Sequence, residues 1–225
     1  KEVFEFIISG WDNNLGGGVY WLEGHKDQKP ACSNGMATLA ALKLYQATNE
    51  QKYLEWGRRF YNWMHSRMRN PEGIYYNDVK MDGKPNPTYY TYNTGSMLES
   101  AMLLYKFTRE DSYLKEAQLV AKNSLYFFSK QKQDIRQFNV DLPWFLTVLF
   151  RGYEALYHVD NNPKYLKAVI VDLDRAWGNA ADKNGLISAK WVTDQQALKK
   201  PKWLLDEACI AELYARVSRL NLANK

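Results

Sequence analysis

Near its start the chain contains GWDNNLGGGVYWLEG, a stretch in which three consecutive glycines separate two tryptophans. Trp11 and Asp12 precede the glycines, and Trp21 follows them. An indole can stack on the apolar face of a sugar ring while a carboxylate accepts hydrogen bonds from the sugar hydroxyls. Because glycine has no side chain, Gly17 and Gly18 could bring the backbone close to a ligand. The stretch therefore predicts part of a carbohydrate-binding site.

A tight connection between two helices is the structural alternative for these glycines. Such a turn needs positive φ at one or two positions, so a run of three glycines exceeds its requirement. We therefore expect positive φ at one or more of residues 16–18, with the backbone there facing the bound sugar. On this hypothesis Gly17→Ala weakens substrate binding more than it weakens folding.

Three later segments also carry side chains suited to sugar binding. ACSNG contains Asn34, YYTYNTG contains Tyr92 and Asn93, and FNVDLPWF contains Asp141. Tyrosine can stack on a sugar, an amide can bind its hydroxyls, and a carboxylate can accept from them. Helix capping is the structural alternative for Asn34 and Asp141, and buried packing is the alternative for the tyrosines. We expect the loop carboxylates Asp12, Asp78 and Asp141 to bind substrate hydroxyls. We also expect Trp21, Tyr92 and Asp12 to lie around one depression.

One pattern occurs three times, and in each copy Leu-Tyr is followed eight residues later by Tyr-Leu. The copies are LYQATNEQKYL (44–54), LYKFTREDSYL (104–114) and LYHVDNNPKYL (156–166). Between the two dipeptides lies a polar turn that Thr48, Thr108 or Asp160 opens. We expect these residues to cap the next helix by accepting backbone N–H bonds. Each copy therefore predicts the end of one helix, a tight turn and the start of another.

The repeats predict an all-α fold of helical hairpins whose long connections collect at one face, where a rigid scaffold would hold a functional site. The expected helices are 1–9, 32–48, 50–68, 95–107, 110–129, 143–158, 161–179 and 204–221. The expected long loops are 69–93, 130–142 and 180–203, and short extended pieces are expected at 18–22 and 75–79. An open stack of hairpins would expose apolar edges, so we expect the chain to form part of a larger closed ring.

Composition argues against several other classes of protein. The net charge is +5, but the basic residues are scattered and match no nucleic-acid-binding motif. No apolar run approaches the ~18 residues of a membrane span. His25, His65 and His158 lack the spacing of metal ligands, and Cys32 and Cys209 are expected to be free thiols. We expect no metal, no cofactor and no nucleic-acid partner.

The order of the motifs resembles glycoside hydrolase family 76, the endo-acting α-1,6-mannanases and their fungal cell-wall relatives. GWD and GGGVYW come first, followed by SNG, the first LYxxT copy, and TYNTG. The resemblance covers nearly the whole chain and implies one (α/α)6 barrel domain, a toroid of six hairpins with the active cleft at one end. It implies hydrolysis of α-mannosidic bonds by a retaining mechanism with two carboxylates. One departure is segment 145–147, where the family usually has Phe-Lys-Gly.

The resemblance places the catalytic residues, two adjacent aspartates, before the glycine stretch. The 225 residues contain no Asp-Asp pair, and they begin without Met inside an amphipathic helical pattern. We therefore expect the barrel domain of residues 1–225 to be incomplete at its N-terminus, with the catalytic pair upstream. One alternative is a non-catalytic carbohydrate-binding relative. Another is a sugar-processing enzyme such as an N-acyl sugar epimerase, which would need histidine bases in the cleft.

Overall fold

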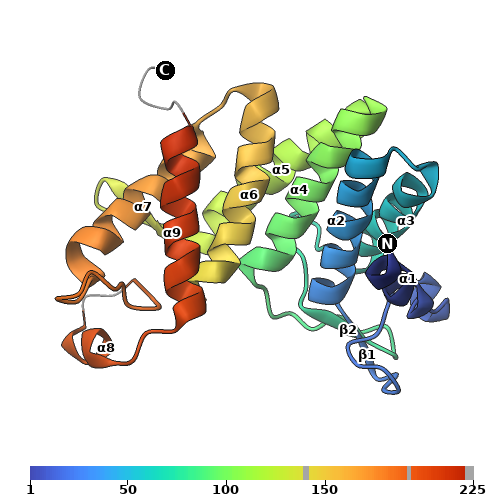
Figure 1. Ribbon diagram of the computed structural model, residues 1–225, viewed down its shortest axis with the longest axis horizontal. Helices are drawn as coiled ribbons and strands as arrows, with labels where there is room; N and C mark the ends of the chain where they lie inside the picture. The colour runs from blue at the N-terminus through green and yellow to red at the C-terminus, as the bar shows by residue number, and fades with distance from the viewer. Residues whose placement is uncertain (139–141, 192–193, 221–225) are drawn as a thin grey trace.

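The computed structural model describes residues 1–138, 142–191 and 194–220, which are mostly helical (Figure 1). The helices are α1 (Glu2–Ser9), α2 (Ala31–Thr48), α3 (Gln51–Arg67), α4 (Thr91–Thr108), α5 (Asp111–Phe128), α6 (Pro143–Asp160), α7 (Lys164–Ala180), α8 (Gln195–Lys199) and α9 (Leu204–Arg219). A 3-10 turn, η1, covers Asn14–Gly16. The all-α prediction is confirmed, and the long helices follow the expected order.

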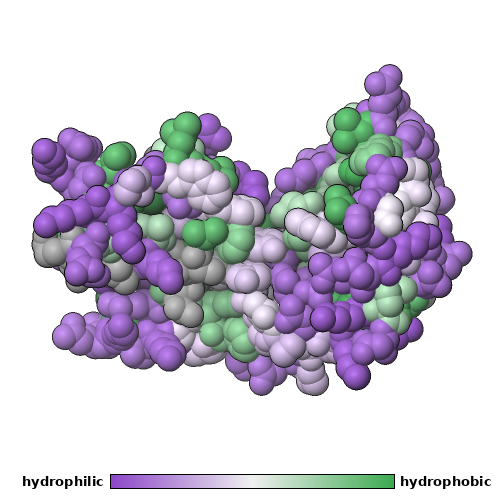
Figure 2. Space-filling view, turned by 90° about the horizontal axis from the view of Figure 1, so that it is seen from below, coloured by the Kyte–Doolittle hydropathy of each residue, from purple (hydrophilic) through white to green (hydrophobic). Residues whose placement is uncertain are grey.

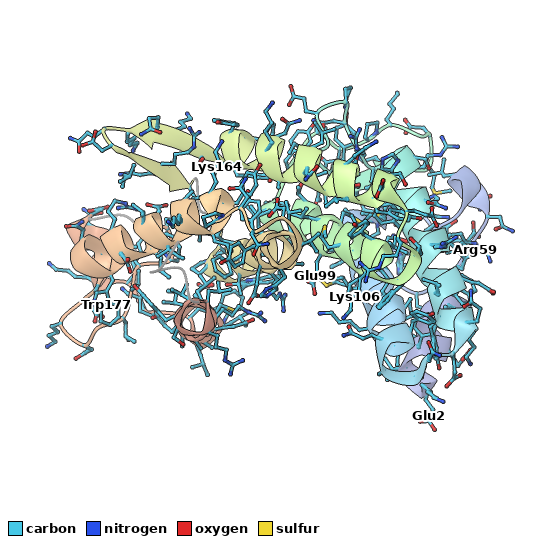
Figure 3. The ribbon with its side chains drawn as sticks, turned by 90° about the horizontal axis from the view of Figure 1, so that it is seen from above. Glu2, Arg59, Glu99, Lys106, Lys164 and Trp177 are labelled. Atoms are coloured by element: carbon cyan, nitrogen blue, oxygen red, sulfur yellow. The ribbon has the colours of Figure 1, made fainter. Side chains whose placement is uncertain are left out.

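The helices form two layers. α2, α4, α6 and α9 lie side by side in one row (Figure 1). Helices α3, α5 and α7 pack behind this row, and each forms a hairpin with the helix that precedes it in the chain. Seen from above, the two rows curve, so the described residues form an open arc of hairpins (Figure 3). One continuous apolar core, which includes Phe150 and Leu98 at 0% exposure, fills the space between the layers.

The tight turns of the hairpins repeat the same backbone geometry. Each has a residue in the left-handed region directly after a helix: Asn49 (φ 56°), Arg109 (φ 60°) and Asn161 (φ 54°). Each also has a side-chain oxygen that accepts the N–H two residues further along: Thr48 from Glu50 (3.3 Å), Thr108 from Glu110 (3.2 Å) and Asp160 from Asn162 (2.9 Å). These side chains accept backbone N–H groups as expected, but they do not cap the next helix. Each is the last residue of the helix before the turn, and α3, α5 and α7 have Glu50, Glu110 and Pro163 at their N-caps with no side-chain cap hydrogen bond.

The glycine of the TYNTG motif allows α4 and α6 to approach closely. A Cβ on Gly95 would lie 2.5 Å from both the Cα and the N of Leu149. On the other helix, a Cβ on Gly152 would lie 2.9 Å from the carbonyl oxygen of Gly95. Backbone therefore packs directly on backbone at this crossing, and only glycine fits at both positions.

The strands are short and pair in two small antiparallel ladders. β1 (Gln28–Pro30) pairs with β2 (Asp78–Lys80), and β3 (Ser129–Lys132) pairs with β4 (Ile135–Phe138). The sequence predicted an extended piece near β2, but it assigned residues 130–142 to a loop. That loop forms a hairpin because its turn has Gln133 in the left-handed region (φ 52°), which no glycine signals in the sequence. Helix α8 was also not expected.

The long connections before α4 and α9 gather at one face as predicted, whereas the β3–β4 hairpin packs against α7. The N-terminal ends of α2, α4, α6 and α9 all lie at the lower end of the molecule in Figure 1, together with β1, β2 and α8. Figure 2 views this end from below and shows pale and green side chains bordered by purple, hydrophilic ones. Two pockets lie among these segments.

Candidate substrate-binding site

The glycine stretch has the backbone conformation that the sequence predicts, but its close contacts are with tryptophans. Gly16, Gly17 and Gly18 all have positive φ, at 81°, 140° and 86°. A Cβ on Gly17 would lie 2.3 Å from Trp11 Cζ2, and one on Gly18 would lie 2.8 Å from Trp63 Cζ2. The glycines thus let the backbone pack against two indole rings. The substrate-binding role of Gly17 and Gly18 stays a prediction, and neither lines a pocket described below.

A buried lysine on β1 fixes this stretch from inside. Lys29 is 0% exposed, and its Nζ donates to the carbonyl oxygens of Asp12 (2.9 Å), Asn14 (2.7 Å) and Gly17 (2.6 Å). The ammonium also lies 4.8 Å from the ring centroid of Tyr20. Burial lowers the pKa of Lys29, while the nearby carboxylate of Asp12 opposes that shift. Sequence reasoning missed this residue because no local pattern marks a lysine that folds back onto carbonyls 12 to 17 positions earlier.

Asn34 holds the end of the same stretch. It lies in the first turn of α2 and is 0% exposed. Its Oδ1 accepts from the N–H of Val19 (2.8 Å), and its Nδ2 donates to the carbonyls of Val19 (3.0 Å) and Pro30 (2.8 Å). Helix capping is therefore wrong for Asn34, because α2 already begins at Ala31. Both amide hydrogens are used within the protein, so the geometry favours a positioning role over contact with a sugar.

Asp12 presents an ionised carboxylate at the edge of the stretch. Its Oδ1 accepts from the N–H of Asn14 (2.7 Å), and its two oxygens lie 3.5 Å from the Nζ atoms of Lys26 and Lys29. The backbone hydrogen bond from Asn14 is the main reason that the pKa of Asp12 lies below its usual value, with partial burial opposing it. Asp12 therefore carries its negative charge at neutral pH.

The first of the two pockets, which we call the aromatic pocket, has a volume of about 550 Å³. It lies at the N-terminal ends of α2, α4 and α6, and Tyr92 and Trp21 both line it. Its walls are Trp21, Gln28, Pro30, Cys32, Asn77, Asp78, Tyr90, Tyr92, Leu142 and Phe145. The rings of Tyr90 and Tyr92 stack with their centroids 5.7 Å apart and an interplanar angle of 15°. The ring centroid of Phe145 lies 4.2 Å from that of Tyr92. Such a wall suits the apolar face of a sugar.

The second pocket, which we call the α1–α2 pocket, has a volume of about 830 Å³. Both Trp11 and Asp12 line it, along with side chains of α1 and α2 such as Phe6 and Met36. Trp21, which is 59% exposed, lines this pocket as well as the aromatic pocket. The sequence predicted Trp21, Tyr92 and Asp12 around one depression. The structure instead pairs Trp21 with Tyr92 in one pocket and with Asp12 in the other.

The two remaining predicted residues are Asn93 and Asp141. Asn93 lies in the first turn of α4 at 0% exposure, and neither atom of its side-chain amide has a hydrogen-bond partner in the structure. It does not line the aromatic pocket, so its contact with substrate stays a prediction. Asp141 lies outside the described residues.

Within the described ranges no group of His, Cys, Asp and Glu side chains could hold a metal ion. Cys32 and Cys209 are free and partly buried, and the three histidines are exposed. Among these same residues no helix is long and apolar enough to cross a membrane. The pockets therefore offer aromatic rings and polar side chains as their binding groups.

Curved rows of helical hairpins, with an aromatic pocket where the inner helices begin, define the chain as an α/α-hairpin protein. The chain belongs to glycosyl hydrolase family 76, which matches residues 1–216. This confirms the family and the (α/α)6 barrel class that the motifs indicated.

Curated proteins are also similar to this chain. Mannan endo-1,6-alpha-mannosidase DCW1 of Candida albicans is 26% identical over an alignment of 231 positions, which covers 92% of this chain and 51% of that protein. The DCW1 protein of Saccharomyces cerevisiae is 30% identical over 139 residues, covering 57% of this chain and 31% of that protein. The chain thus spans at most about half the length of these relatives.

Solved structures of the family are also similar. The mannosidase Bt3792 of Bacteroides thetaiotaomicron is 29% identical with a TM-score of 0.86, and the match covers 99% of this chain and 64% of that chain. A family 76 hydrolase from a bovine strain of the same species is 32% identical with a TM-score of 0.85, covering 96% of this chain and 50% of that one. An alpha-1,6-mannanase of Salegentibacter, 24% identical with a TM-score of 0.80, was solved with alpha-1,6-mannotetrose as an inactive variant lacking two adjacent aspartates.

Proposed function

We propose that these residues form the substrate-binding part of an endo-acting glycoside hydrolase that cleaves α-1,6-linked mannan. The aromatic pocket carries this proposal, because it combines stacked tyrosines with polar side chains at the end of the barrel where the long connections gather. The names of the curated relatives support α-1,6-mannan as the substrate class. The proposed binding residues are Trp11, Asp12, Gly17, Gly18, Trp21, Asn34, Tyr92, Asn93 and Asp141, with Asn34 acting through the stretch that it holds.

The proposed chemistry is retaining hydrolysis, which uses one carboxylate as nucleophile and a second as acid and base, about 5–5.5 Å apart. These 225 residues contain no adjacent aspartates. We therefore propose that the catalytic pair lies outside them, as the inactive variant of the Salegentibacter mannanase supports by analogy.

An epimerase would need histidine bases in the cleft, and the structure does not favour that alternative. His25, His65 and His158 are all exposed, and none of them lines either pocket. A carbohydrate-binding relative without catalysis would use the same pockets, so a binding measurement tests the part of the proposal that both share.

Replacing Trp21 by alanine is expected to weaken the binding of α-1,6-mannotetraose at least tenfold, which corresponds to about 1.4 kcal/mol. The reason is that the indole lines both pockets and is 59% exposed, so it is free to stack on a sugar. Titration calorimetry on the wild type and the variant measures the change.

Trp177→Ala is the matched control, because Trp177 is 53% exposed but lies on the outer helix α7, far from α2 in Figure 3. Its affinity should equal that of the wild type. Equal affinities for all three proteins would show that Trp21 does not contact the oligosaccharide.

A further inference from the structure

Asp78 differs from Asp12 in having a buried carboxylate oxygen without a hydrogen-bond partner. It lies on β2 opposite Pro30, is 4% exposed, and lines the aromatic pocket. Its Oδ2 accepts from the side-chain amides of Asn77 (3.0 Å) and Asn86 (2.7 Å). Its Oδ1 is buried and has no hydrogen-bond partner in the structure. The protein thus fixes Oδ2, while Oδ1 remains able to accept a hydrogen bond.

A buried acceptor without a donor is costly, so such groups are rare unless a ligand or water completes them. No lysine or arginine forms an ion pair with Asp78 among the described residues. By contrast, the carboxylate of Asp12 already receives an N–H and lies near two lysines. Asp78 is therefore the carboxylate of the described site that is best prepared to accept from a ligand.

The surroundings of Asp78 indicate what kind of donor it takes. Trp21, Tyr90 and Tyr92 line the same pocket, and the two tyrosine rings are stacked. A flat aromatic wall next to an acceptor fits a sugar ring, which has an apolar face and hydroxyl donors at its edge. The backbone also holds Asp78 in place, since its carbonyl oxygen accepts from the N–H of Asn86 at 2.7 Å.

We propose that Asp78 Oδ1 accepts a hydrogen bond from one hydroxyl of the sugar bound in the aromatic pocket, and that Asp78 thereby selects among sugars. The inference rests on the proposed function for the class of substrate. A site built to bond one hydroxyl discriminates strongly against an analogue that lacks it, because the buried acceptor is then left unpaired.

Asp78→Asn tests this with little change of shape. In the variant the side-chain oxygen keeps the two amide donors from Asn77 and Asn86, so the new NH2 group takes the place of Oδ1. An acceptor becomes a donor where the sugar hydroxyl donates. The affinity of the protein for α-1,6-mannotetraose is expected to fall at least tenfold, with the melting temperature nearly unchanged.

Asp27→Asn is the matched control, because Asp27 is exposed and directly precedes β1, the partner strand of β2. It removes the same charge and should leave the affinity unchanged. A set of methyl α-mannosides that each lack one hydroxyl then identifies the bonded group. For one analogue only, Asp78→Asn should cause no further loss of binding, because the bond is already absent.

The outcomes separate the two proposals. Wild-type affinity in Asp78→Asn, or additive losses for every analogue, would overturn the role of Asp78 while α-1,6-mannan binding stands. If the wild type bound a different hexose oligosaccharide and Asp78→Asn weakened that binding, the proposed substrate would be wrong and the role of Asp78 would stand. If the wild type bound no oligosaccharide, both proposals would fall.

Discussion

Gly95→Ala is expected to lower the free energy of unfolding by about 3 kcal/mol, the upper range for overpacking, because the new Cβ meets backbone atoms. That Cβ would lie 2.5 Å from the Cα and N of Leu149 and 2.6 Å from the carbonyl carbon of Val148. A flexible side chain could move aside, but a helix backbone moves only if α4 and α6 separate. The inner row should therefore loosen where both helices begin, next to the aromatic pocket.

Denaturant unfolding measures this change, and Gly178→Ala is the matched control. Gly178 is also helical, but it is exposed on α7 and a Cβ there meets nothing within 4 Å. Alanine at that position should raise stability by roughly 0.5–1 kcal/mol, because it has the higher helix propensity. If both variants were equally stable, the close crossing of α4 and α6 would be absent in solution.

Gly17→Ala is expected to destabilise the protein by about 3 kcal/mol, from a strained φ and a clash together. The φ of Gly17 is 140°, and its Cβ would lie 2.3 Å from Trp11 Cζ2. Trp11 has little room to move, since its ring lies 4.9 Å from that of Phe60 and 4.4 Å from the guanidinium of Arg59. This corrects the expectation from sequence, on which folding would be affected less than binding.

The control for this variant is Gly24→Ala, which isolates the strain. Gly24 has φ of 78°, and a Cβ there meets nothing within 4 Å. The free energy of unfolding of Gly24→Ala should fall by about 1 kcal/mol, which is the cost of positive φ alone. Thermal and urea unfolding of both variants, with mannotetraose affinity measured on the folded protein, compare the two effects. An unchanged stability with a large loss of affinity in Gly17→Ala would contradict the expected clash with Trp11 and would support a direct contact between the glycines and the sugar.

Local patterns in the sequence were enough to predict the hairpins. The Leu-Tyr and Tyr-Leu repeat marks helix ends, and the hydrogen bonds at Thr48, Thr108 and Asp160 span only two residues. The positive φ of the glycines is likewise local, because a glycine run signals it directly. Hydrogen bonds between residues far apart in the chain could not be predicted from such local patterns. Asn34 bonds the backbone of Val19, 15 residues away, and no spacing rule identifies that pair.

The site was predicted in part for the same reason. The aromatic residues Trp21 and Tyr92 do share a pocket, because the loop of Trp21 meets the first turn of α4, which carries Tyr92. The sequence could not show that the carboxylate of Asp12 already has partners within the protein while Asp78 keeps a free oxygen. That distinction depends on the pairing of β1 with β2, which brings residues 28–30 beside 78–80.

Digestion of α-1,6-mannan, followed by NMR of the reducing ends, tests the central claim most directly. A protein that joins these residues to the adjacent aspartate pair should release short oligomannosides whose new ends are first α, as retention requires. The 225 residues alone should bind mannotetraose and release nothing. If the longer protein left α-1,6-mannan uncut, the proposed activity would be contradicted, and turnover by the 225 residues alone would place the catalytic carboxylates among them.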